Sequence, residues 1–298
     1  MREGLAFLAC VFIWGSTWFL IEFQLGVTPE AWSVALRFLV SSLMLMVIIL
    51  ASGKTLRLEP SAHRWALGLG IFLFSSNYLL IYFGTGFLTS GLVAVSFSVL
   101  SLFNLINSRI FLGQRIDGIL GLAAMIGVLG LLLIFQDEVG ALSFEDATFT
   151  GIAFCVGATF VASLGNMVAA AGGGRGIALL PFNAWGMLYG AGINAVYAVI
   201  LGDPFVLDDR LSYWVSLFVL AGFGTVLAFT LYLWLVSQIG LSRAAYVAVL
   251  MPLVALGLST IFEGFVWTPT ALAGVGMIVA GNVMIIRRRS AAPKAETT

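Results

Sequence analysis

The chemistry available to this chain comes from a few polar and aromatic side chains set inside long apolar segments. Arg37 is the one charged residue within such a segment, about six residues from the nearer end and roughly 9 Å deep. A charge buried in a membrane is costly and often marks a functional site. Arg37 could therefore attract a substrate carboxylate or an anionic headgroup. The alternative, which we favour, is that its long side chain reaches the outer interface or pairs with Glu22 or Glu30.

A polar stripe runs along the segment 89–111. Ser101 and Asn104 lie near its middle, and Asn107 lies toward its inner end. Helical spacing of three and four residues places them along one side, and lipid does not accept a face that carries two asparagines. We expect Ser101 and Asn104 to face a cavity and Asn107 to join neighbouring helices. Pro252, near the middle of a later segment, frees a backbone carbonyl, so it is either a hinge at the substrate or a plain kink.

Aromatic and hydroxyl side chains recur at helical spacing in other segments. Tyr78 and Tyr82 share one face, as do Trp14 and Trp18, and Asn77 either lines a cavity or joins helices. Tryptophan and tyrosine usually lie at the membrane interface, but Trp14 and Tyr78 are deeper. A cavity with aromatic walls and a few hydroxyl groups suits an apolar or aromatic metabolite with a small polar end. The predicted substrate-binding residues are Trp14, Trp18, Tyr78, Tyr82, Ser101, Asn104, Thr159, Ser163, Phe229, Tyr232, Tyr246 and Pro252, with Arg37 as a candidate carboxylate contact.

The inventory of reactive side chains excludes an enzyme. The chain has one histidine, His63, and no Asp, Glu, Lys or His in the middle of an apolar segment. A nucleophile with its base, a carboxylate pair or a set of metal ligands cannot be assembled, so we expect no catalysis, cofactor or metal. The lack of a mid-segment carboxylate favours transport without ion coupling, although unwound backbone carbonyls can also bind Na⁺. A net charge of zero gives no reason to expect a nucleic acid partner.

Ten apolar segments must position these residues. Of the 298 residues, 61% are hydrophobic and only 9% are charged, far below the roughly 25% of a soluble domain. A spanning helix needs about 20 apolar residues, so ten of them fill nearly the whole length. The predicted spans are 5–22, 31–51, 64–84, 89–111, 117–135, 148–171, 178–200, 212–236, 243–262 and 268–286. We therefore predict an all-α protein that crosses the lipid bilayer of the cell (inner) membrane ten times.

Charged residues between the segments sort by sign, and this predicts the topology. Twelve of the fourteen Lys and Arg residues fall in alternate gaps, namely Arg2, Lys54, Arg57, Arg64, Arg109, Arg115, Arg175, Arg243, Arg287, Arg288, Arg289 and Lys294. The other gaps have Arg210 as the lone basic exception and hold Glu22, Glu30, Asp137, Glu138, Glu145, Asp146, Asp203, Asp208, Asp209 and Glu263. Short loops rich in Lys and Arg stay in the cytoplasm, so both termini are predicted to be cytoplasmic.

A weak internal repeat divides the chain into halves. Residues 4–7 (GLAF) resemble residues 151–154 (GIAF) at an offset of 147, and residues 108–111 resemble 259–262 at an offset of 151. Each half holds five helices, an odd number, so the second half would enter the membrane inverted. Inverted repeats place a substrate site near the midplane, where the halves meet. The predicted domains are a first five-helix repeat over 1–140, an inverted repeat over 141–286 and a basic cytoplasmic tail over 287–298.

Short motifs in a fixed order carry a family resemblance. They are WGST at 14–17, ALRF at 35–38, FLGQ at 111–114 and LMPL at 250–253. Together they resemble the ten-helix EamA-type exporters of the drug/metabolite transporter superfamily, over the whole chain. Within that family, the aromatic cavity composition is most similar to the YddG-type aromatic amino acid exporters. Two positions depart from the family pattern, since Ser101 stands where proline is usual and Gln114 where glutamate is usual.

The resemblance implies export, and the residues agree with a carrier. We expect a membrane carrier that exports small, largely apolar metabolites, amino acids including aromatic ones, by alternating access and without obvious ion coupling. A multidrug carrier, a nucleotide- or sugar-type metabolite carrier and a channel-like facilitator are the alternatives. The inverted repeat favours alternating access over a continuous pore. The sequence leaves open whether the protein forms a homodimer.

Overall fold

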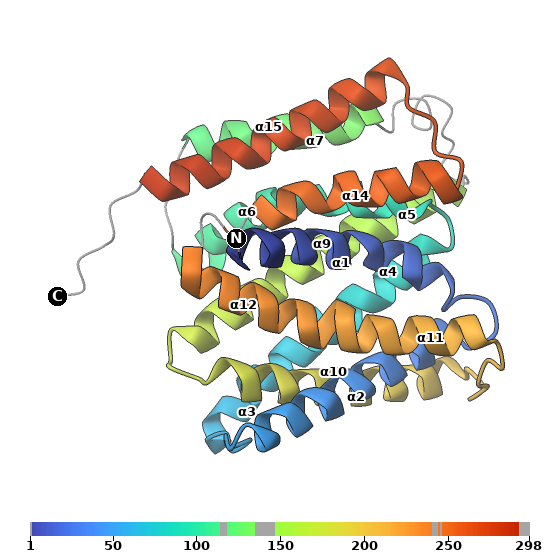
Figure 1. Cartoon of the computed structure of the whole chain (residues 1–298), viewed down its shortest axis with the longest axis vertical. Helices are drawn as coiled ribbons and strands as arrows, with labels where there is room; N and C mark the ends of the chain where they lie inside the picture. Colours follow the sequence, from blue (N-terminus) through green and yellow to red (C-terminus); the bar gives the residue numbers. More distant parts are fainter. Residues whose placement is uncertain (1, 114–117, 135–146, 240–243, 245, 292–298) are drawn as a thin grey trace.

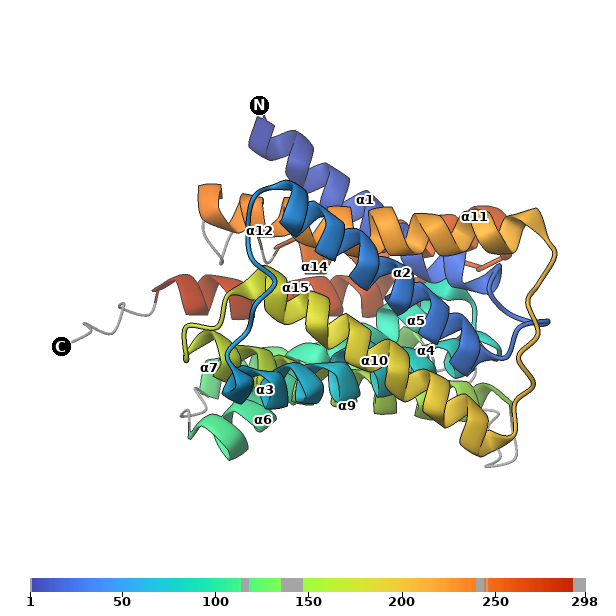
Figure 2. The same ribbon diagram turned by 90° about the horizontal axis from the view of Figure 1, so that it is seen from below.

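The computed structural model of this protein describes residues 2–113, 118–134, 147–239, 244 and 246–291. Long helices lie roughly side by side, with their ends toward the left and right of Figure 1. The first helix begins and the last helix ends at the left-hand side of that view. Figure 2 shows the same bundle from below, where the helices form more than one layer.

The described elements are all helical. In chain order they are α1 (Arg2–Glu22), α2 (Glu30–Ala51), α3 (Pro60–Ile71), η1 (Phe72–Ser76), α4 (Asn77–Thr85), α5 (Ser90–Ser96), η2 (Phe97–Val99), α6 (Leu100–Leu112), α7 (Gly118–Ile134), α9 (Ala147–Gly173), α10 (Leu179–Leu201), α11 (Leu211–Val219), η3 (Leu220–Leu227), α12 (Ala228–Ile239), α14 (Tyr246–Phe262) and α15 (Pro269–Ala291). Several of them join end to end into one long run, as α3, η1 and α4 do over Pro60–Thr85.

The helices have the length and composition that a membrane requires. Among the described residues, seven helices or helical runs are long and apolar enough to cross a membrane, and three further apolar helices are shorter. The prediction of an all-helical membrane fold is confirmed at this level. Within the predicted tail over 287–298, α15 continues as far as Ala291. Arginine is a good helix former, so Arg287 and the residues that follow it extend the helix rather than end it. Residues 292–298 lie outside the described part.

Two π-helical segments interrupt the regular helices at corresponding places. η1 separates α3 from α4, and η3 separates α11 from α12, at an offset of 148 residues (220 − 72). A third irregular segment, the 3₁₀ turn η2, separates α5 from α6. π-Helical turns widen a helix locally and often occur at functional sites. All three segments adjoin residues of the cavity described below.

Glycine allows α7 and α15 to pack closely. A Cβ atom built on Gly130 would lie 2.5 Å from the carbonyl oxygen of Gly274, and one built on Gly281 would lie 2.5 Å from that of Ala123. Real side chains do not approach backbone so closely, so only glycine fits there. Gly121 differs, because a Cβ added to it meets no atom within 4 Å.

Glu263 joins the two halves of the chain at the end of α14. Its Oε2 accepts hydrogen bonds from the backbone N of Ser90 (3.0 Å) and from the Ser90 hydroxyl (2.9 Å). Ser90 is the first residue of α5, and a carboxylate is favourable at a helix N-terminus. The Glu263 side chain therefore caps a helix of the first half from the second.

Candidate substrate cavity

A cavity of about 220 Å³ lies between helices from both halves of the chain. Five elements of the first half and two of the second contribute to its wall. The lining residues are Trp14, Thr17, Trp18 and Ile21 of α1, Arg37 of α2, Asn77, Tyr78 and Ile81 of α4, Phe97 of η2, Leu100 of α6, Phe229 of α12 and Met251 of α14. The structure thus brings together five of the predicted residues, namely Trp14, Trp18, Arg37, Tyr78 and Phe229.

Arg37 is enclosed by protein rather than placed at the membrane interface. Its side chain is 1% exposed, and the guanidinium carbon lies 4.7 Å from the ring centre of Tyr78 and 5.6 Å from that of Phe38. Its Nε and Nη1 have no hydrogen-bond partner among the described residues, and no ion pair there joins it to Glu22 or Glu30. The favoured expectation of a surface or ion-paired arginine is therefore corrected. The face of α2 that carries Arg37 turns inward, and aromatic rings cover the charge.

Two further polar groups near Arg37 are also without partners in the described part of the chain. Tyr82 is fully buried, its hydroxyl makes no hydrogen bond, and it lies within electrostatic reach of Arg37. Asn77 donates weakly from Nδ2 to the carbonyl oxygen of Leu73 (3.4 Å), while its Oδ1 has no donor. Buried polar atoms are normally paired, so unpaired ones call for a ligand, water or strain. Arg37 offers free donors and Asn77 a free acceptor among the residues that line the cavity.

Aromatic rings form much of the remaining cavity wall and contact one another. The indole N–H of Trp14 donates to the carbonyl oxygen of Gly224 in the π-helical segment η3 (3.0 Å). This bond fixes the Trp14 ring, whose centre lies 5.4 Å from Phe229 and 5.2 Å from Tyr232. Trp18 lies 6.0 Å from Phe97 on the same side. The Trp14–Phe229 pair is edge-on and the other two pairs are tilted, and such ring pairs are favourable.

The polar residues of α6 contact neighbouring helices rather than this cavity. The Ser101 hydroxyl donates to Oδ1 of Asn282 in α15 (2.9 Å). Asn104 accepts a hydrogen bond at Oδ1 from Nδ2 of Asn166 in α9 (3.2 Å). Both predicted residues therefore join helices in this structure, as polar groups often do in membranes.

The remaining predicted residues also lie outside the cavity lining. Ser163 accepts a hydrogen bond from Nδ2 of Asn107 (2.9 Å), which agrees with the helix-joining role expected for that asparagine. The Thr159 hydroxyl donates to the carbonyl oxygen of Cys155 one turn earlier (2.7 Å). The others are placed as follows: Tyr82 next to Arg37, Tyr232 beside Trp14, Tyr246 half-buried at the start of α14, and Pro252 buried within α14.

Several lining residues carry too little sequence signal to be predicted. Ile21, Ile81 and Leu100 are aliphatic like most of the chain, so composition cannot separate cavity from core. Phe97 gives a partial signal, because an aromatic residue there lies between two serines of a polar segment. Asn77 is a mid-helix amide, and only its unpaired oxygen in the folded protein distinguishes a cavity residue from one that joins helices.

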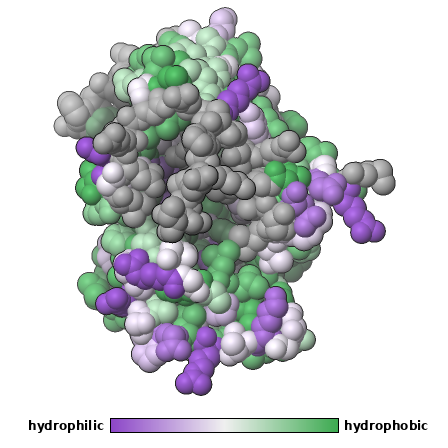
Figure 3. Space-filling view, turned by 90° about the vertical axis from the view of Figure 1, so that its left-hand side faces the viewer, coloured by the Kyte–Doolittle hydropathy of each residue, from purple (hydrophilic) through white to green (hydrophobic). Residues whose placement is uncertain are grey.

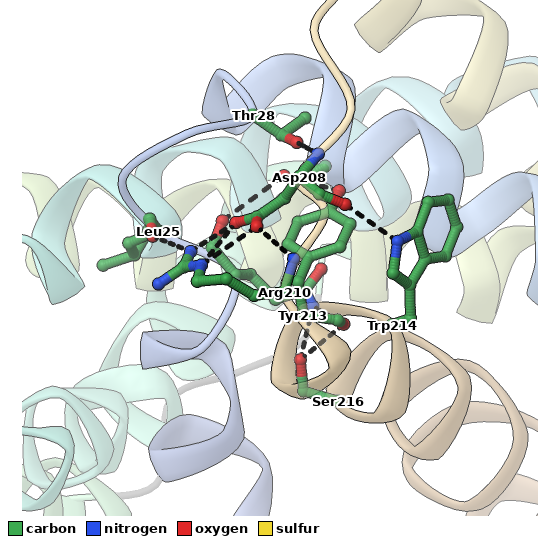
Figure 4. A network of polar contacts seen from close by, with 9 residues as sticks. Leu25, Thr28, Asp208, Arg210, Tyr213, Trp214 and Ser216 are labelled. Atoms are coloured by element: carbon green, nitrogen blue, oxygen red, sulfur yellow. Dashed lines mark hydrogen bonds and ion pairs between the residues drawn. The ribbon is translucent and has the colours of Figure 1, made fainter.

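A polar network closes the end of the bundle at which α2 and α11 begin (Figure 4). Arg210 forms an ion pair with Asp208, donates from Nε to both carboxylate oxygens (3.0 and 2.8 Å) and donates from Nη2 to the carbonyl oxygen of Leu25 (2.8 Å). The Asp208 backbone N donates to the Thr28 hydroxyl (3.0 Å), and the Trp214 indole donates to the Asp208 carbonyl (2.8 Å). The guanidinium of Arg210 lowers the pKa of the Asp208 carboxyl. Because Asp208 neutralises Arg210, this exception to the charge sorting carries little net charge.

The network extends toward Arg37 through a buried tyrosine. Tyr213 is fully buried, and its hydroxyl lies 3.0 Å from the Ser33 hydroxyl of α2. Gln24 donates from Nε2 to the Tyr213 carbonyl oxygen (2.7 Å), which ties the end of α1 to α11. Tyr213 also lies within electrostatic reach of Tyr82, beside Arg37. Segments from both halves of the chain thus interlock at this end.

Comparison with known proteins identifies the family. The sequence profile of the EamA-like transporter family matches residues 1–136 and 149–287. The chain belongs to the EamA-like transporter family. This family lies within the drug/metabolite transporter superfamily, so the resemblance in the sequence is confirmed. It is a family of multi-pass membrane transporters rather than enzymes.

Relatives of known name support the same assignment. The chain is 25% identical over 302 residues to "Uncharacterized inner membrane transporter YedA" of Escherichia coli K12, covering 94% of this chain and 89% of YedA. It is 21% identical over 292 residues to "Protein PagO" of Salmonella typhimurium LT2, covering 96% and 93%. An uncharacterized transporter of Archaeoglobus fulgidus is 24% identical, covering 97% and 100%. A crystal structure of another protein superposes with a TM-score of 0.69 over 97% of this chain and 99% of that chain, at 16% identity, which shows a shared fold.

Proposed function

We propose that this EamA-like protein is an inner-membrane carrier that exports small, largely apolar metabolites, with amino acids, including aromatic ones, as the substrate class. The observation that carries the proposal is the enclosed guanidinium of Arg37, which has free donors and no counter-ion among the described residues. An arginine fork matches a carboxylate, so an anionic substrate group would complete the site.

The rest of the cavity wall supports an amino acid rather than a simple acid. The free Oδ1 of Asn77 would accept a hydrogen bond from a substrate ammonium group. The rings of Trp18, Tyr78 and Phe97 supply apolar contact for a side chain and can also face a cation. A zwitterion places its carboxylate and ammonium close together, and the cavity offers a cation and an acceptor among its lining residues.

Size and charge disfavour two of the alternatives. The cavity of about 220 Å³ is smaller than the roughly 300–1,000 Å³ that drug-sized ligands occupy, so a multidrug carrier fits less well. A nucleotide carries several negative charges, whereas Arg37 is the one cationic residue that lines this cavity. A small monocarboxylate with an amine fits both limits.

Alternating access between two inverted five-helix repeats is part of the proposal. It is supported by the two separate stretches that match the family profile and by the matching positions of the π-helical segments η1 and η3. Ten spans with cytoplasmic termini would follow from these repeats and from the sorting of loop charges. The interlocked network around Asp208 and Arg210 would then close the outer side of the cavity. Outward release requires this network to open while the other end closes.

Counterflow in liposomes tests the proposal. Purified protein is reconstituted, loaded with unlabelled phenylalanine and given labelled phenylalanine outside. We expect saturable counterflow, weak competition by phenethylamine, which lacks the carboxylate, and weak competition by phenylpropionate, which lacks the amine. Charge-assisted hydrogen bonds contribute about 1.5–3 kcal/mol, so Arg37→Gln should weaken apparent affinity by about 10- to 100-fold.

The matched control is Arg109→Gln, which removes an exposed arginine at the end of α6 and should leave counterflow unchanged. Flux that never saturates and shows no competition would instead indicate a channel-like facilitator. Saturable counterflow that is indifferent to Arg37→Gln would refute the role of the guanidinium. Lack of counterflow for every amino acid tested would refute the substrate class.

A further inference from the structure

A basic pocket of about 450 Å³ lies at the end of the bundle where α1 begins and α15 ends (Figures 1 and 2). The loop before α3 and the turn before α10 line it. Arg57, Arg64 and Arg175 contribute three positive charges, and Glu59 is the one acidic lining residue, so the pocket carries a net charge of +2 (3 − 1). Figure 3 looks onto this end of the bundle, and hydrophilic side chains gather on its lower part. In Figure 1, one end of α3 and one end of α10 lie at the same height.

The arginines of this pocket have no anionic partner in the part of the chain that the structure describes. Arg175 lies 4.2 Å and Arg64 lies 5.7 Å from the ring centre of Trp65, so two cations share one indole. Arg175 also donates from Nη1 to the carbonyl oxygen of Ala171 (2.8 Å), which holds it in place. Within the described residues, neither these two nor Arg57 forms an ion pair. Like charges held this close favour a shared anion.

The backbone around the pocket adds to the attraction for an anion. α3 begins at Pro60 and α10 begins at Leu179, and the first residues of both helices adjoin the pocket. Neither helix has a side-chain hydrogen bond at its N-cap. Helix N-termini carry partial positive charge, so they reinforce the three guanidinium groups.

Apolar grooves adjoin the pocket on two sides. One groove of about 690 Å³ shares Thr55 and Ala178 with the pocket and continues over apolar residues of α2, α10 and α12, with Lys54 at its edge. A second groove of about 300 Å³ shares Trp65 with the pocket and continues over Phe72 and apolar residues of α6 and α9. The basic pocket at the end of the bundle is therefore continuous with two apolar grooves.

We propose that the pocket binds the headgroup of an anionic diacyl phospholipid, whose two acyl chains occupy the two grooves. The cationic pocket matches the phosphate, and the paired grooves match the two chains. Basic pockets between spanning helices are known to select anionic headgroups. A free phosphate would use the arginines but leave both grooves empty, so the grooves favour the lipid. This site is separate from the Arg37 cavity and does not depend on the transported substrate.

Lipid titration of the full-length protein in neutral detergent tests the inference. Native mass spectrometry measures binding of phosphatidylglycerol, of phosphatidylethanolamine with the same chains, and of inorganic phosphate as a competitor. We expect phosphatidylglycerol to bind at least about tenfold more tightly than phosphatidylethanolamine, and inorganic phosphate to compete poorly. An arginine near an anionic headgroup contributes about 1 kcal/mol, so the double variant Arg57→Ala/Arg175→Ala should bind phosphatidylglycerol about 30-fold more weakly.

The control variant Arg109→Ala/Arg287→Ala removes two exposed charges outside the pocket lining and should bind phosphatidylglycerol normally. Equal binding of the two phospholipids by the unmodified protein would overturn the inference without any variant. Equal losses in the pocket and control variants would overturn it as well, because the effect would then follow net charge. Effective competition by inorganic phosphate would reassign the site to a soluble anion. Each of these outcomes can be told apart from a failure of amino acid counterflow.

Discussion

Replacing Arg37 with methionine should make the empty protein more stable while weakening its affinity for carboxylates. The guanidinium is enclosed, 1% exposed and free of a counter-ion among the described residues. A buried charge without a partner destabilises the fold that contains it. Methionine has a similar length, adapts to irregular space and makes favourable contacts with aromatic rings, so it suits the space beside Tyr78 and Phe38.

The size of the effect follows from two opposing terms. An arginine at the centre of a spanning helix costs about 2.5–3.5 kcal/mol, and this is the upper limit for the shallower Arg37. Its contacts with the rings of Tyr78 and Phe38 return about 1–2 kcal/mol. Arg37→Met should therefore raise the free energy of unfolding by about 1–2 kcal/mol. A carboxylate substrate at 100 times its Kd should stabilise the original protein by about 2.7 kcal/mol, but Arg37→Met, with affinity about 10- to 100-fold weaker, by only about 0.4–1.4 kcal/mol.

Equilibrium unfolding in detergent micelles, with and without phenylalanine, measures both quantities. Arg109→Met serves as the control, since Arg109 is exposed and its replacement should change stability by less than about 0.5 kcal/mol. A loss of more than about 2 kcal/mol in Arg37→Met would refute the reasoning, because it would show that the guanidinium is paired in the folded state. Equal stabilisation of both proteins by phenylalanine would refute the carboxylate contact.

Three further predictions concern the framework around the cavity. Arg210 holds the pKa of the Asp208 carboxyl below its ordinary value of about 4. The pair therefore contributes stability above that pH, and this stability is lost as the pH falls through the lowered pKa. Asp208→Asn should make the stability of the protein depend less on pH in the acid range. Glu263→Ala removes the cap of α5 and should cost about 1 kcal/mol in equilibrium unfolding, with an unchanged value arguing against the cap. Gly130→Ala would push α7 away from α15 and should lower the free energy of unfolding by about 1–3 kcal/mol. Gly121→Ala, where the added methyl group meets no atom, should be tolerated. Equal thermal stability of the two variants would contradict the close packing.

The helices and the class of protein can be predicted from the sequence because both depend on how apolar residues are distributed along the chain. A run of apolar residues long enough to span a bilayer satisfies its backbone only as a helix, so hydropathy locates the helices and the loops between them. The family match and the transporter names of the relatives agree with the class that the sequence predicts. Arg37 is recognisable as unusual because it is a charge within such a run.

The partners of each polar side chain are decided only when the helices pack. Ser101, Asn104 and Arg37 all look like candidate cavity residues, because each is polar and lies within an apolar segment. In the folded protein Ser101 and Asn104 find partners on neighbouring helices, while Arg37 finds rings and, among the described residues, no counter-ion. The sequence fixes the period of a helix but not its rotation against its neighbours. That rotation determines whether a buried polar atom meets another helix or an open cavity.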